Sequence, residues 1–289
     1  MSVIALPRAE AAPRRAGPHW IVLLARRRTT VVGAILMTLM IGVGVLAPLI
    51  GGDPSHMDVA GRLAAPGRVH WFGTDDVGRD VWSRVVYGAR LSLLVGVAVV
   101  VLSFVVGVVC GVVAGYYRRL DNVVMRVMDG LMAFPAIVLA IALMAALGPS
   151  VVNVIVAIAV VYSPRVARVV RGSVLVIRET SYVEAARALG ASDVTLIARH
   201  VLPNCLSPVI VQGSFVFAAA VLTEAALSFL GVGVRPPTPT WGGMLSDATH
   251  WYQIAPHFML WPGLAIFVTV LAFNLFGDGL RDALDPRSR

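Results

Sequence analysis

The run Ser181–Pro203, SYVEAARALGASDVTLIARHVLP, is mostly polar and lies between two hydrophobic segments that are long enough to span a membrane. Ser181 and Glu184 have the spacing of a capping box, which predicts a short helix that begins at Ser181. Gly190 can end this helix in the left-handed conformation, and Asp193 can cap a second helix that ends at the final proline. We therefore expect a polar loop of two short helices between two membrane spans.

The composition indicates a membrane protein. Of the 289 residues, 58% are hydrophobic and 14% are charged, whereas charged residues make up about 25% of a soluble domain. The net charge is +8, but no basic patch with interleaved aromatic residues occurs, so nucleic acid is not an expected partner. We expect a multi-pass protein in the lipid bilayer.

Several catalytic classes find no support in the sequence. Lysine does not occur, so the lysine of a phosphate-binding P-loop is missing. No HExxH, GxSxG or CxxC pattern occurs, and the two cysteines, Cys110 and Cys205, suggest neither a disulfide framework nor a metal cluster. We expect no catalytic residue, no metal site and no cofactor in this chain.

Hydropathy predicts six membrane-spanning helices, each near the roughly 20 residues that a bilayer requires. They cover residues 31–50, 91–117, 123–147, 151–170, 208–230 and 258–276. The expected organisation is an N-terminal tail with an interfacial helix (1–30), a first span (31–50), an extracytoplasmic loop (51–90), a core of five spans (91–280) that contains the polar loop (172–207), and a tail (281–289).

The positions of the arginines predict the orientation. If the N-terminus is cytoplasmic, the inner side holds the arginines of the N-terminal tail, those in 118–126, those in 165–199 and those after residue 280. Fewer arginines remain for the outer side, mostly in 62–90. Because cytoplasmic loops carry an excess of basic residues, we expect both termini and the polar loop to be cytoplasmic.

A second polar motif precedes the second span. Thr74 or Asp75 can cap a helix in which Val81, Val85 and Val86 face apolar surroundings. The acids and arginines of the motif then pair with each other or face water. The simpler interpretation is that the motif is only an ion-paired, solvated start of the next span. The alternative is that it also has a functional role, and the sequence leaves both interpretations open. The residues singled out are Gly73, Thr74, Asp75, Gly78, Arg79, Asp80 and Arg84.

Two acidic residues fall within predicted spans, where ionisable groups are costly and often functional. Asp129 lies near Arg126, and we expect an ion pair between them at the cytoplasmic end of the third span. Glu224 lies deeper, and two interpretations remain open for it: it lines a translocation path, or it bridges two helices. Both residues are therefore candidates for the pore or gate.

Two further patterns concern helix packing and the position of aromatic residues. Gly107, Gly111 and Gly115 recur every fourth residue, so they share one helical stripe against which another helix can pack closely. Near the C-terminus, Trp241 and Trp251 are expected to anchor the protein at the level of the lipid headgroups, or else to offer a docking surface.

The polar loop resembles a known family motif. Glu184-Ala185-Ala186, followed by Gly190 and Leu202-Pro203, is similar to the EAA loop in the membrane subunits of ABC importers, although His200 stands where the family has an aliphatic residue. The GTDxxGRDxxSR pattern from Gly73 to Arg84 resembles the signature of the C-type permease of dipeptide and oligopeptide importers. Stretches 223–231 and 237–242 add to this resemblance, which covers about residues 71–286.

The resemblance implies a fold, partners and a function. The fold would be the all-α, six-span permease fold of type I ABC importers, in the plasma membrane of a bacterium. The partners would be a second, B-type permease, two ABC ATPases that carry ATP and Mg, and an extracytoplasmic substrate-binding protein. The ATPase contact would consist of Glu184, Ala185, Ala186, Arg187, Gly190, Leu202 and Pro203.

The substrate stays open at this point. The resemblance implies dipeptides or oligopeptides, while nickel, glutathione or haem are alternatives within the same family. A stand-alone channel or secondary transporter is a different class, but we find no internal repeat of the kind that secondary transporters commonly show. A membrane scaffold that does not transport is a third class.

Overall fold

The structure is a computed structural model that describes residues 27–284. Most of the expected N-terminal tail with its interfacial helix (1–30), and the residues after 284, lie outside this range. Helices make up nearly all regular structure of the described residues, beside one isolated antiparallel bridge between Thr74 and Asp80. The helices are α2 (Arg28–Ile50), η1 (Val59–Gly61), α3 (Val81–Tyr116), α4 (Arg118–Met132), α5 (Ala136–Leu147), α6 (Val151–Ile177), α7 (Ser181–Ala188), α8 (Asp193–Leu196), the π-helical turn η2 (Ile197–Val201), α9 (Leu202–Phe229), α10 (Trp241–Ala248) and α11 (Pro256–Leu284).

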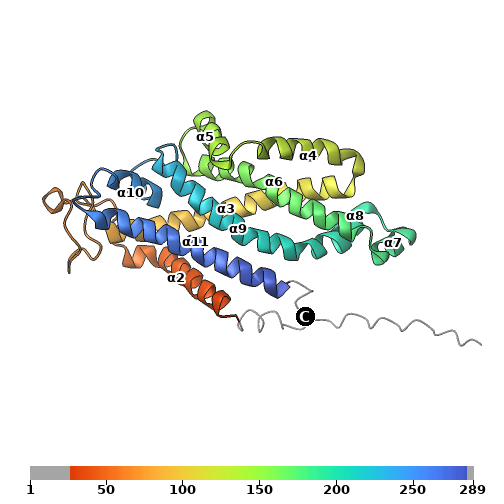
Figure 1. Cartoon of the computed structure of the whole chain (residues 1–289), viewed down its shortest axis with the longest axis horizontal. Coiled ribbons are helices and arrows are strands. Elements are labelled where there is room, and N and C mark those ends of the chain that lie inside the picture. Colours follow the sequence, from red (N-terminus) through yellow and green to blue (C-terminus); the bar gives the residue numbers. More distant parts are fainter. Residues whose placement is uncertain (1–26, 285–289) are drawn as a thin grey trace, which may run out of the picture.

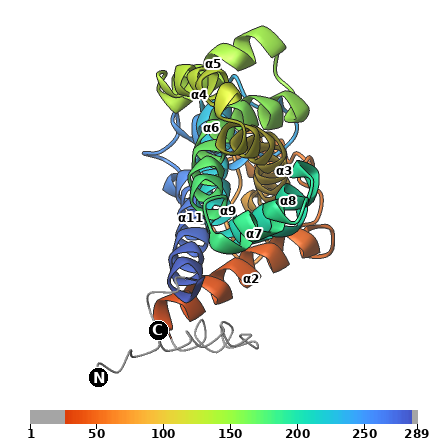
Figure 2. The same ribbon diagram turned by 90° about the vertical axis from the view of Figure 1, so that its right-hand side faces the viewer.

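The long helices run side by side along the longest axis of the molecule (Figure 1). Five helical stretches are long and apolar enough to cross a membrane: α2, α3, α6, the stretch from α8 through α9, and α11. Helices α7 and α8 lie at one end of the bundle, and α10 lies with the segment 51–80 at the other (Figure 1). Figure 2 looks onto the end that carries α7 and α8, where the start of α2 and the end of α11 also lie. Arg27 forms an ion pair with Asp282 at this end.

Helices α3 and α6 pack together along the predicted glycine stripe. An added Cβ at Gly107 would lie 2.6 Å from Cβ of Val166, and at Gly115 it would lie 2.7 Å from Cβ of Val174. At Gly111 it would lie 2.6 Å from the carbonyl oxygen of Ala167. The glycines therefore allow a close helix approach, which confirms the packing role expected for the stripe.

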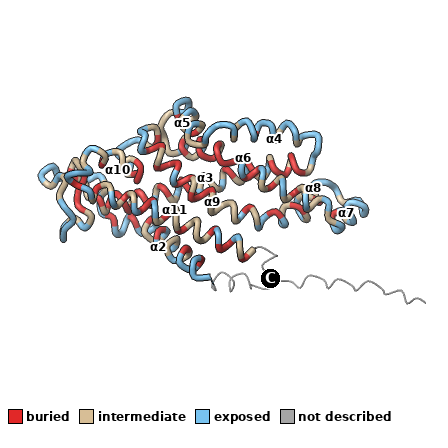
Figure 3. Tube along the Cα trace, in the orientation of Figure 1, coloured by how far each residue is buried: buried red, intermediate tan, exposed pale blue. Residues whose placement is uncertain are grey.

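Two hydrophobic clusters form the core, and they meet along α3 and α9. One lies between α3, α5, α6 and α9, and the other joins α2, α3, α9, α10 and α11 around the buried side chains of Trp241 and Phe258. Figure 3 shows the buried residues concentrated in the central helices, while α4 and α7 are mostly exposed. Trp241 is fully buried, and its Nε1 donates to the carbonyl oxygen of Val85 at 2.9 Å. The expectation that Trp241 anchors the protein at the headgroups is therefore wrong.

The third predicted span, 123–147, is not one continuous helix. Helices α4 and α5 meet at an angle of 93° across a short break. Pro135, whose backbone is extended, lies immediately before α5 and lacks the N–H that would continue the helix. Helix α5 has only 12 residues, too few to cross about 30 Å of hydrocarbon alone. Helices α4 and α5 together make a sixth membrane crossing only if the bent pair is counted as one span.

Helix α3 begins ten residues before Leu91, the predicted start of the second membrane span. It runs for 36 residues, which corresponds to about 54 Å at 1.5 Å per residue. This length exceeds the hydrocarbon thickness of about 30 Å. The first turns of α3, from Val81, therefore belong to the polar end of the molecule rather than to the membrane span.

Candidate functional site

The first candidate region is the loop of α7 and α8. Helix α7 follows Thr180, and no side chain caps its N-terminus, so the predicted capping box between Ser181 and Glu184 is not formed. Its C-terminus ends as expected, with Gly190 at a φ of +86°. The amide of Gly190 donates to the carbonyl of Arg187 at 3.0 Å, and that of the next residue to Ala186 at 3.1 Å. These two bonds form a Schellman motif, which fixes the turn after α7.

The second short helix also differs from the prediction. Ser192, not Asp193, is the N-cap of α8, and its Oγ accepts from the amide of Thr195 at 3.3 Å. The helical path does not end at Pro203, because the π-helical turn η2 leads directly into α9. Pro203 lies in the first turn of α9, and a single π-helical turn can interrupt an α-helix without ending it. The loop and α9 are thus mechanically continuous.

Side-chain contacts fasten the loop to the end of α3. The hydroxyl of Tyr116 donates to Oδ1 of Asp193 at 2.7 Å, and the guanidinium of Arg187 lies 6.0 Å from the centroid of the Tyr116 ring. Arg178 donates through Nη1 to the carbonyl oxygen of Gly115 at 2.7 Å. Val183 of α7 is buried as well. The loop is therefore held against α3 while remaining part of the chain that leads into α9.

The outward surface of this loop is mixed in character. Leu189 and Val194 are apolar side chains that are 90% and 74% exposed. Glu184, Ala185 and Arg187 are also exposed, whereas Ala186 is half-buried. Farther along the chain, Leu202 is half-buried and Pro203 is exposed. The structure thus places most of the predicted contact residues on an accessible surface at one end of the bundle.

The second candidate region is the motif before α3. Asp75 is fully buried, and its Oδ1 accepts from the amides of Val77 and Arg79 at 3.0 and 2.8 Å. Its Oδ2 accepts from Nε of Arg79 at 2.6 Å. Asp80 is the N-cap of α3 and accepts from the amide of Ser83 at 2.8 Å. The capping role predicted for Thr74 or Asp75 therefore belongs to Asp80, because Asp75 is occupied by the turn that precedes the helix.

The glycines of this motif are required by the turn. Gly73 and Gly78 have φ values of +78° and +83°, in the region that favours glycine. A Cβ at Gly78 would lie 1.8 Å from the carbonyl oxygen of Asp58. The buried faces of Val81, Val85 and Val86 are as predicted.

The motif borders a polar pocket shared with α10 and the end of α9. We call this the arginine pocket; it has a volume of about 360 Å³, and its lining includes Arg79, Arg84, Ser228, Arg235, Thr240 and Asp247. Nη2 of Arg79 lies 3.8 Å from Oδ2 of Asp247. Burial raises the pKa of Asp247 and the charge of Asp76 adds to this effect, while the nearby arginines oppose it. Sequence reasoning identified the arginines of the motif but missed Asp247, because nothing local to it signals this contact.

Glu224 and Asp129, the two acidic residues predicted within spans, have different surroundings. Glu224 is fully buried and accepts from Oγ of Ser92 at 3.2 Å and from Oγ of Ser228 at 2.9 Å. It therefore bridges α3 and α9, which is one of the two interpretations left open. Asp129 pairs with Arg168 of α6 at 2.7 Å and not with Arg126, so the expected partner is wrong.

The reason for the different partner is the break before α5. Helix α4 lies along α6 as a separate amphipathic helix, and Asp121 also accepts from Nε and Nη2 of Arg171 at 2.6 and 2.7 Å. Asp129 is more than half exposed. It is therefore part of the α4–α6 contact at the surface.

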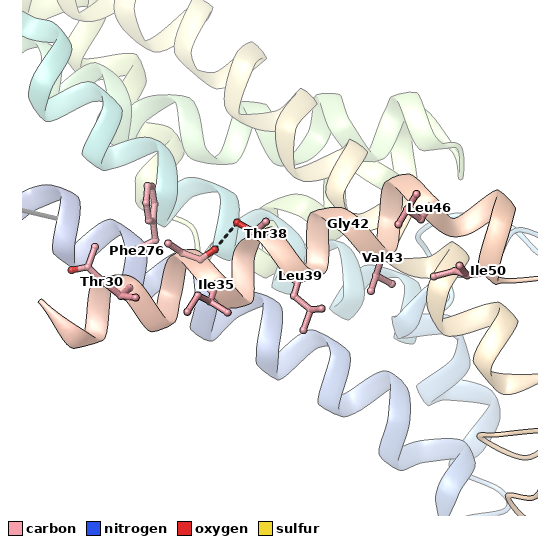
Figure 4. A pocket seen from close by; sticks show the side chains of 11 residues that line it. Thr30, Ile35, Thr38, Leu39, Gly42, Val43, Leu46, Ile50 and Phe276 are labelled. Atoms are coloured by element: carbon pink, nitrogen blue, oxygen red, sulfur yellow. Dashed lines mark hydrogen bonds between the residues drawn. The ribbon is translucent and has the colours of Figure 1, made fainter. Parts of the chain in front are cut away.

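An apolar groove follows α2. It has a volume of about 800 Å³ and is lined by residues of α2 and by Phe276. Figure 4 shows Ile35, Leu39 and Val43 along this helix, and the hydroxyl of Thr38 is turned inward to its own backbone, where it donates to Ala34 at 2.8 Å. The groove offers hydrophobic surface and no polar chemistry. Among residues 27–284, no group of three or more His, Cys, Asp and Glu could hold a metal ion.

The fold and these sites define an integral membrane protein with the architecture of a transporter permease. In solved structures of the methionine ABC transporter MetNI, one chain superposes with a TM-score of 0.59 at 19% identity, covering 70% of this chain and 97% of that chain. A structure of an amino acid ABC transporter with histidines gives a TM-score of 0.54 at 15% identity, over 70% and 94% of the two chains. These likenesses show the fold.

The chain belongs to the family of binding-protein-dependent transport system inner membrane components, which matches residues 103–289. A protein of Brucella suis biovar 1 named as a peptide transport system permease is 52% identical, covering 91% of this chain and 90% of that protein. The dipeptide transport system permease protein DppC of Alkalihalophilus pseudofirmus is 46% identical, covering 92% and 88%. The glutathione transport system permease protein GsiD of Pectobacterium atrosepticum is 44% identical, covering 91% and 88%. The chain is thus a transport permease of the ABC class.

Proposed function

We propose that this chain is one of two permease subunits that together form the pore of an ATP-driven importer for dipeptides or oligopeptides. The substrate class follows from relatives named for peptide and dipeptide transport that align over nearly the whole chain. The observation that carries the coupling role is the loop of α7 and α8, which is fixed to α3, continuous with α9 and accessible at one end of the bundle.

The exposed surface of this loop fits a contact with an ATPase. Leu189 and Val194 expose apolar side chains at the end of the molecule, where a partner could cover them. Ala185 is small and exposed beside Glu184, so a partner surface can approach α7 closely. The contact comprises these residues together with Ala186, Arg187 and Gly190. ATP and Mg would then bind to the partner ATPases, and this chain would supply no catalytic group.

Force can pass from the loop into the membrane along two routes. The π-helical turn joins α8 to α9 without a break, and the Tyr116–Asp193 hydrogen bond joins α8 to α3. A displacement of α7 on ATP binding would therefore move α3 and α9, which Glu224 bridges. ATP binding must stabilise one arrangement of these helices over the other, since otherwise transport has no direction.

The remaining partners follow from this assignment. A second permease completes the pore, an extracytoplasmic binding protein delivers the peptide to the end that carries α10, and both termini are cytoplasmic. The apolar groove along α2 would be covered by lipid or by the second permease. The arginine distribution supports this orientation because the end with α7 and α8 holds more basic residues.

Purification of the tagged chain from its native membrane tests the proposal. We expect a second permease and two ATPases to co-purify, and we expect dialanine with the binding protein to stimulate ATP hydrolysis. Recovery of the chain alone, with transport retained in vesicles, would show a stand-alone transporter. A complex that assembles but never responds to any substrate would show a scaffold.

A pair of variants locates the ATPase contact. Leu189→Ser removes an apolar side chain that is 90% exposed at the loop, and Val69→Ser removes one that is 85% exposed at the opposite end. We expect Leu189→Ser to lower ATPase recovery severalfold and Val69→Ser to leave it unchanged. Equal recovery with both variants would refute the contact.

Glutathione is a second candidate substrate, since the relative GsiD is named for glutathione transport and is 44% identical. Glutathione is a small peptide-like acid and is therefore chemically close to a dipeptide. Competition between labelled dialanine and glutathione for uptake distinguishes the two. If, at equal concentrations, glutathione inhibits dialanine uptake but dialanine does not inhibit glutathione uptake, the importer is assigned to glutathione.

A further inference from the structure

The arginine pocket contains a buried cation without hydrogen bonds. Arg84 is only 5% exposed, and within residues 27–284 its Nε and Nη1 have no hydrogen-bond partner. The nearest acid, Asp75, lies 3.7 Å from Nε. Its oxygens already accept three hydrogen bonds, two from Arg79 and one from Val77. Buried guanidinium nitrogens without hydrogen bonds are costly, and the ion pair with Asp75 at 3.7 Å leaves those of Arg84 unsatisfied, so a further anionic group would be stabilised beside Arg84.

The same pocket also offers an unpaired acceptor. Oδ1 of Asp76 is buried without a hydrogen bond among the described residues, and it lies 4.0 Å from Nη2 of Arg79. Asp247 adds a second carboxylate to the lining, and Arg235 adds a third guanidinium at the exposed rim. The pocket is therefore lined by both signs of charge, and beside it lie donor atoms of Arg84 and an acceptor atom of Asp76 that are buried without hydrogen bonds.

This pattern selects a zwitterion over a simple anion. A phosphate or a divalent anion would be attracted by Arg84 but repelled by Asp76 and Asp247. A carboxylate matches the fork of a guanidinium, and a ligand that also carries an ammonium group would satisfy Asp76. The volume of about 360 Å³ lies within the range of small-molecule sites, about 300 to 1,000 Å³.

We propose that the arginine pocket is a peptide-binding subsite in the permease itself, in which Arg84 binds the terminal carboxylate of a small peptide and Asp76 faces its ammonium group. This inference rests on the proposed function as a peptide importer. The subsite lies at the end of the molecule opposite α7 and α8 (Figure 1), and it receives the peptide before the membrane-spanning part of the pore.

The pocket is also connected to the buried glutamate. Ser228 lines the pocket, and its hydroxyl donates to Oε1 of Glu224 at 2.9 Å. Glu224 in turn accepts from Ser92 of α3. Occupation of the pocket therefore acts on the same two helices, α3 and α9, that the loop of α7 and α8 contacts.

Direct peptide binding to the purified transporter, without its binding protein, tests the subsite. The probe is radiolabelled dialanine in equilibrium dialysis, with dialanine amide and N-acetyl-dialanine as competitors. For the wild type we expect saturable dialanine binding and competition by the amide that is at least tenfold weaker. Arg84→Gln should weaken dialanine binding at least tenfold and abolish the preference over the amide.

Two further variants separate binding from misfolding. Asp76→Asn, at a partly exposed position, should weaken the binding of dialanine but not that of N-acetyl-dialanine, which lacks the ammonium group. Arg68→Gln changes an exposed arginine on the same side of the membrane but outside the pocket, and it should bind dialanine like the wild type.

Several results would overturn the inference. These are the absence of dialanine binding to the wild type, equal competition by the amide, or unchanged peptide binding in Arg84→Gln. If Arg84→Gln instead loses only the capture of the binding protein, the pocket holds an acidic side chain of that protein. Dialanine uptake by the complete transporter is measured in parallel. Uptake without subsite binding overturns this inference alone, whereas the absence of both overturns the proposed function as well.

Discussion

Gly190 allows the coupling role of the loop to be tested one physical effect at a time. Its φ of +86° is in the left-handed region, and an added Cβ would meet no atom within 4 Å. Steric contact within this chain is therefore not at issue, and a substitution acts through backbone strain and through whatever surface lies against the loop. Gly190→Asn, Gly190→Asp and Gly190→Val differ in these two respects.

The expected strain is about 1–2 kcal/mol for an ordinary side chain in this conformation, and less for Asn or Asp. A cost of that size lowers the population of the native turn about 5- to 30-fold relative to alternatives. Gly190→Asn should therefore retain the native turn, while Gly190→Val should populate alternative conformations of the turn. Gly190→Asp keeps nearly the same shape as Asn but adds a negative charge beside α7, so it isolates the effect of charge on the ATPase contact.

The assay compares peptide-stimulated ATP hydrolysis with peptide uptake in proteoliposomes that contain equal amounts of complex. We expect near wild-type coupling for Gly190→Asn, and a severalfold lower uptake per ATP hydrolysed for Gly190→Asp and Gly190→Val, with normal membrane insertion. Wild-type hydrolysis and uptake in the Asp and Val variants would refute the reasoning.

Three further predictions concern packing, the buried acid and pH. Gly111→Leu overpacks α3 against α6 and should cost about 1–3 kcal/mol, seen as a lower unfolding temperature in detergent; an unchanged temperature contradicts the packing. Glu224→Leu leaves two buried serine hydroxyls without their acceptor and should cost about 1–3 kcal/mol, whereas Glu224→Gln should cost less; equal losses contradict the bridge. Because the pKa of Asp247 is raised, its contribution to stability is complete below the unfolded pKa, near ~3.9, and is lost as pH rises through the folded value. Asp247→Asn should flatten the pH dependence of the unfolding temperature over this window, and an unaltered profile would contradict the assignment.

The sequence was sufficient for the helices that contain a long uninterrupted apolar run. Helices α2, α6, α9 and α11 correspond to four predicted spans, because a run of about 20 apolar residues is long enough to cross a bilayer. The glycine stripe on α3 was predictable for the same kind of reason, since a fourfold spacing places three glycines on one face.

The third predicted span was expected to be one continuous helix because hydropathy was averaged across a break. Pro135 and the charged residues Arg126 and Asp129 all fall within the window, and the apolar run of α5 masked them. A proline that follows a polar, amphipathic segment is a local signal for the break. The angle of 93° comes with the pairing of α4 and α6 through Asp121 and Arg171, residues 50 positions apart whose contact no local signal in the sequence predicts.

The capping residues and the arginine pocket depended on contacts between distant segments. Asp80 rather than Asp75 caps α3, because Asp75 is held by the preceding turn. Asp247 meets Arg79 only through the folding of α10 against α3. The motif before α3 was recognisable as a motif, but its role in forming a pocket required the structure.

The most direct test of the central claim is the uptake of labelled dialanine into proteoliposomes that contain the complex purified through this chain. We predict uptake that requires both ATP and the binding protein and that is lower in Gly190→Asp. Uptake by this chain alone, without ATP, would contradict it.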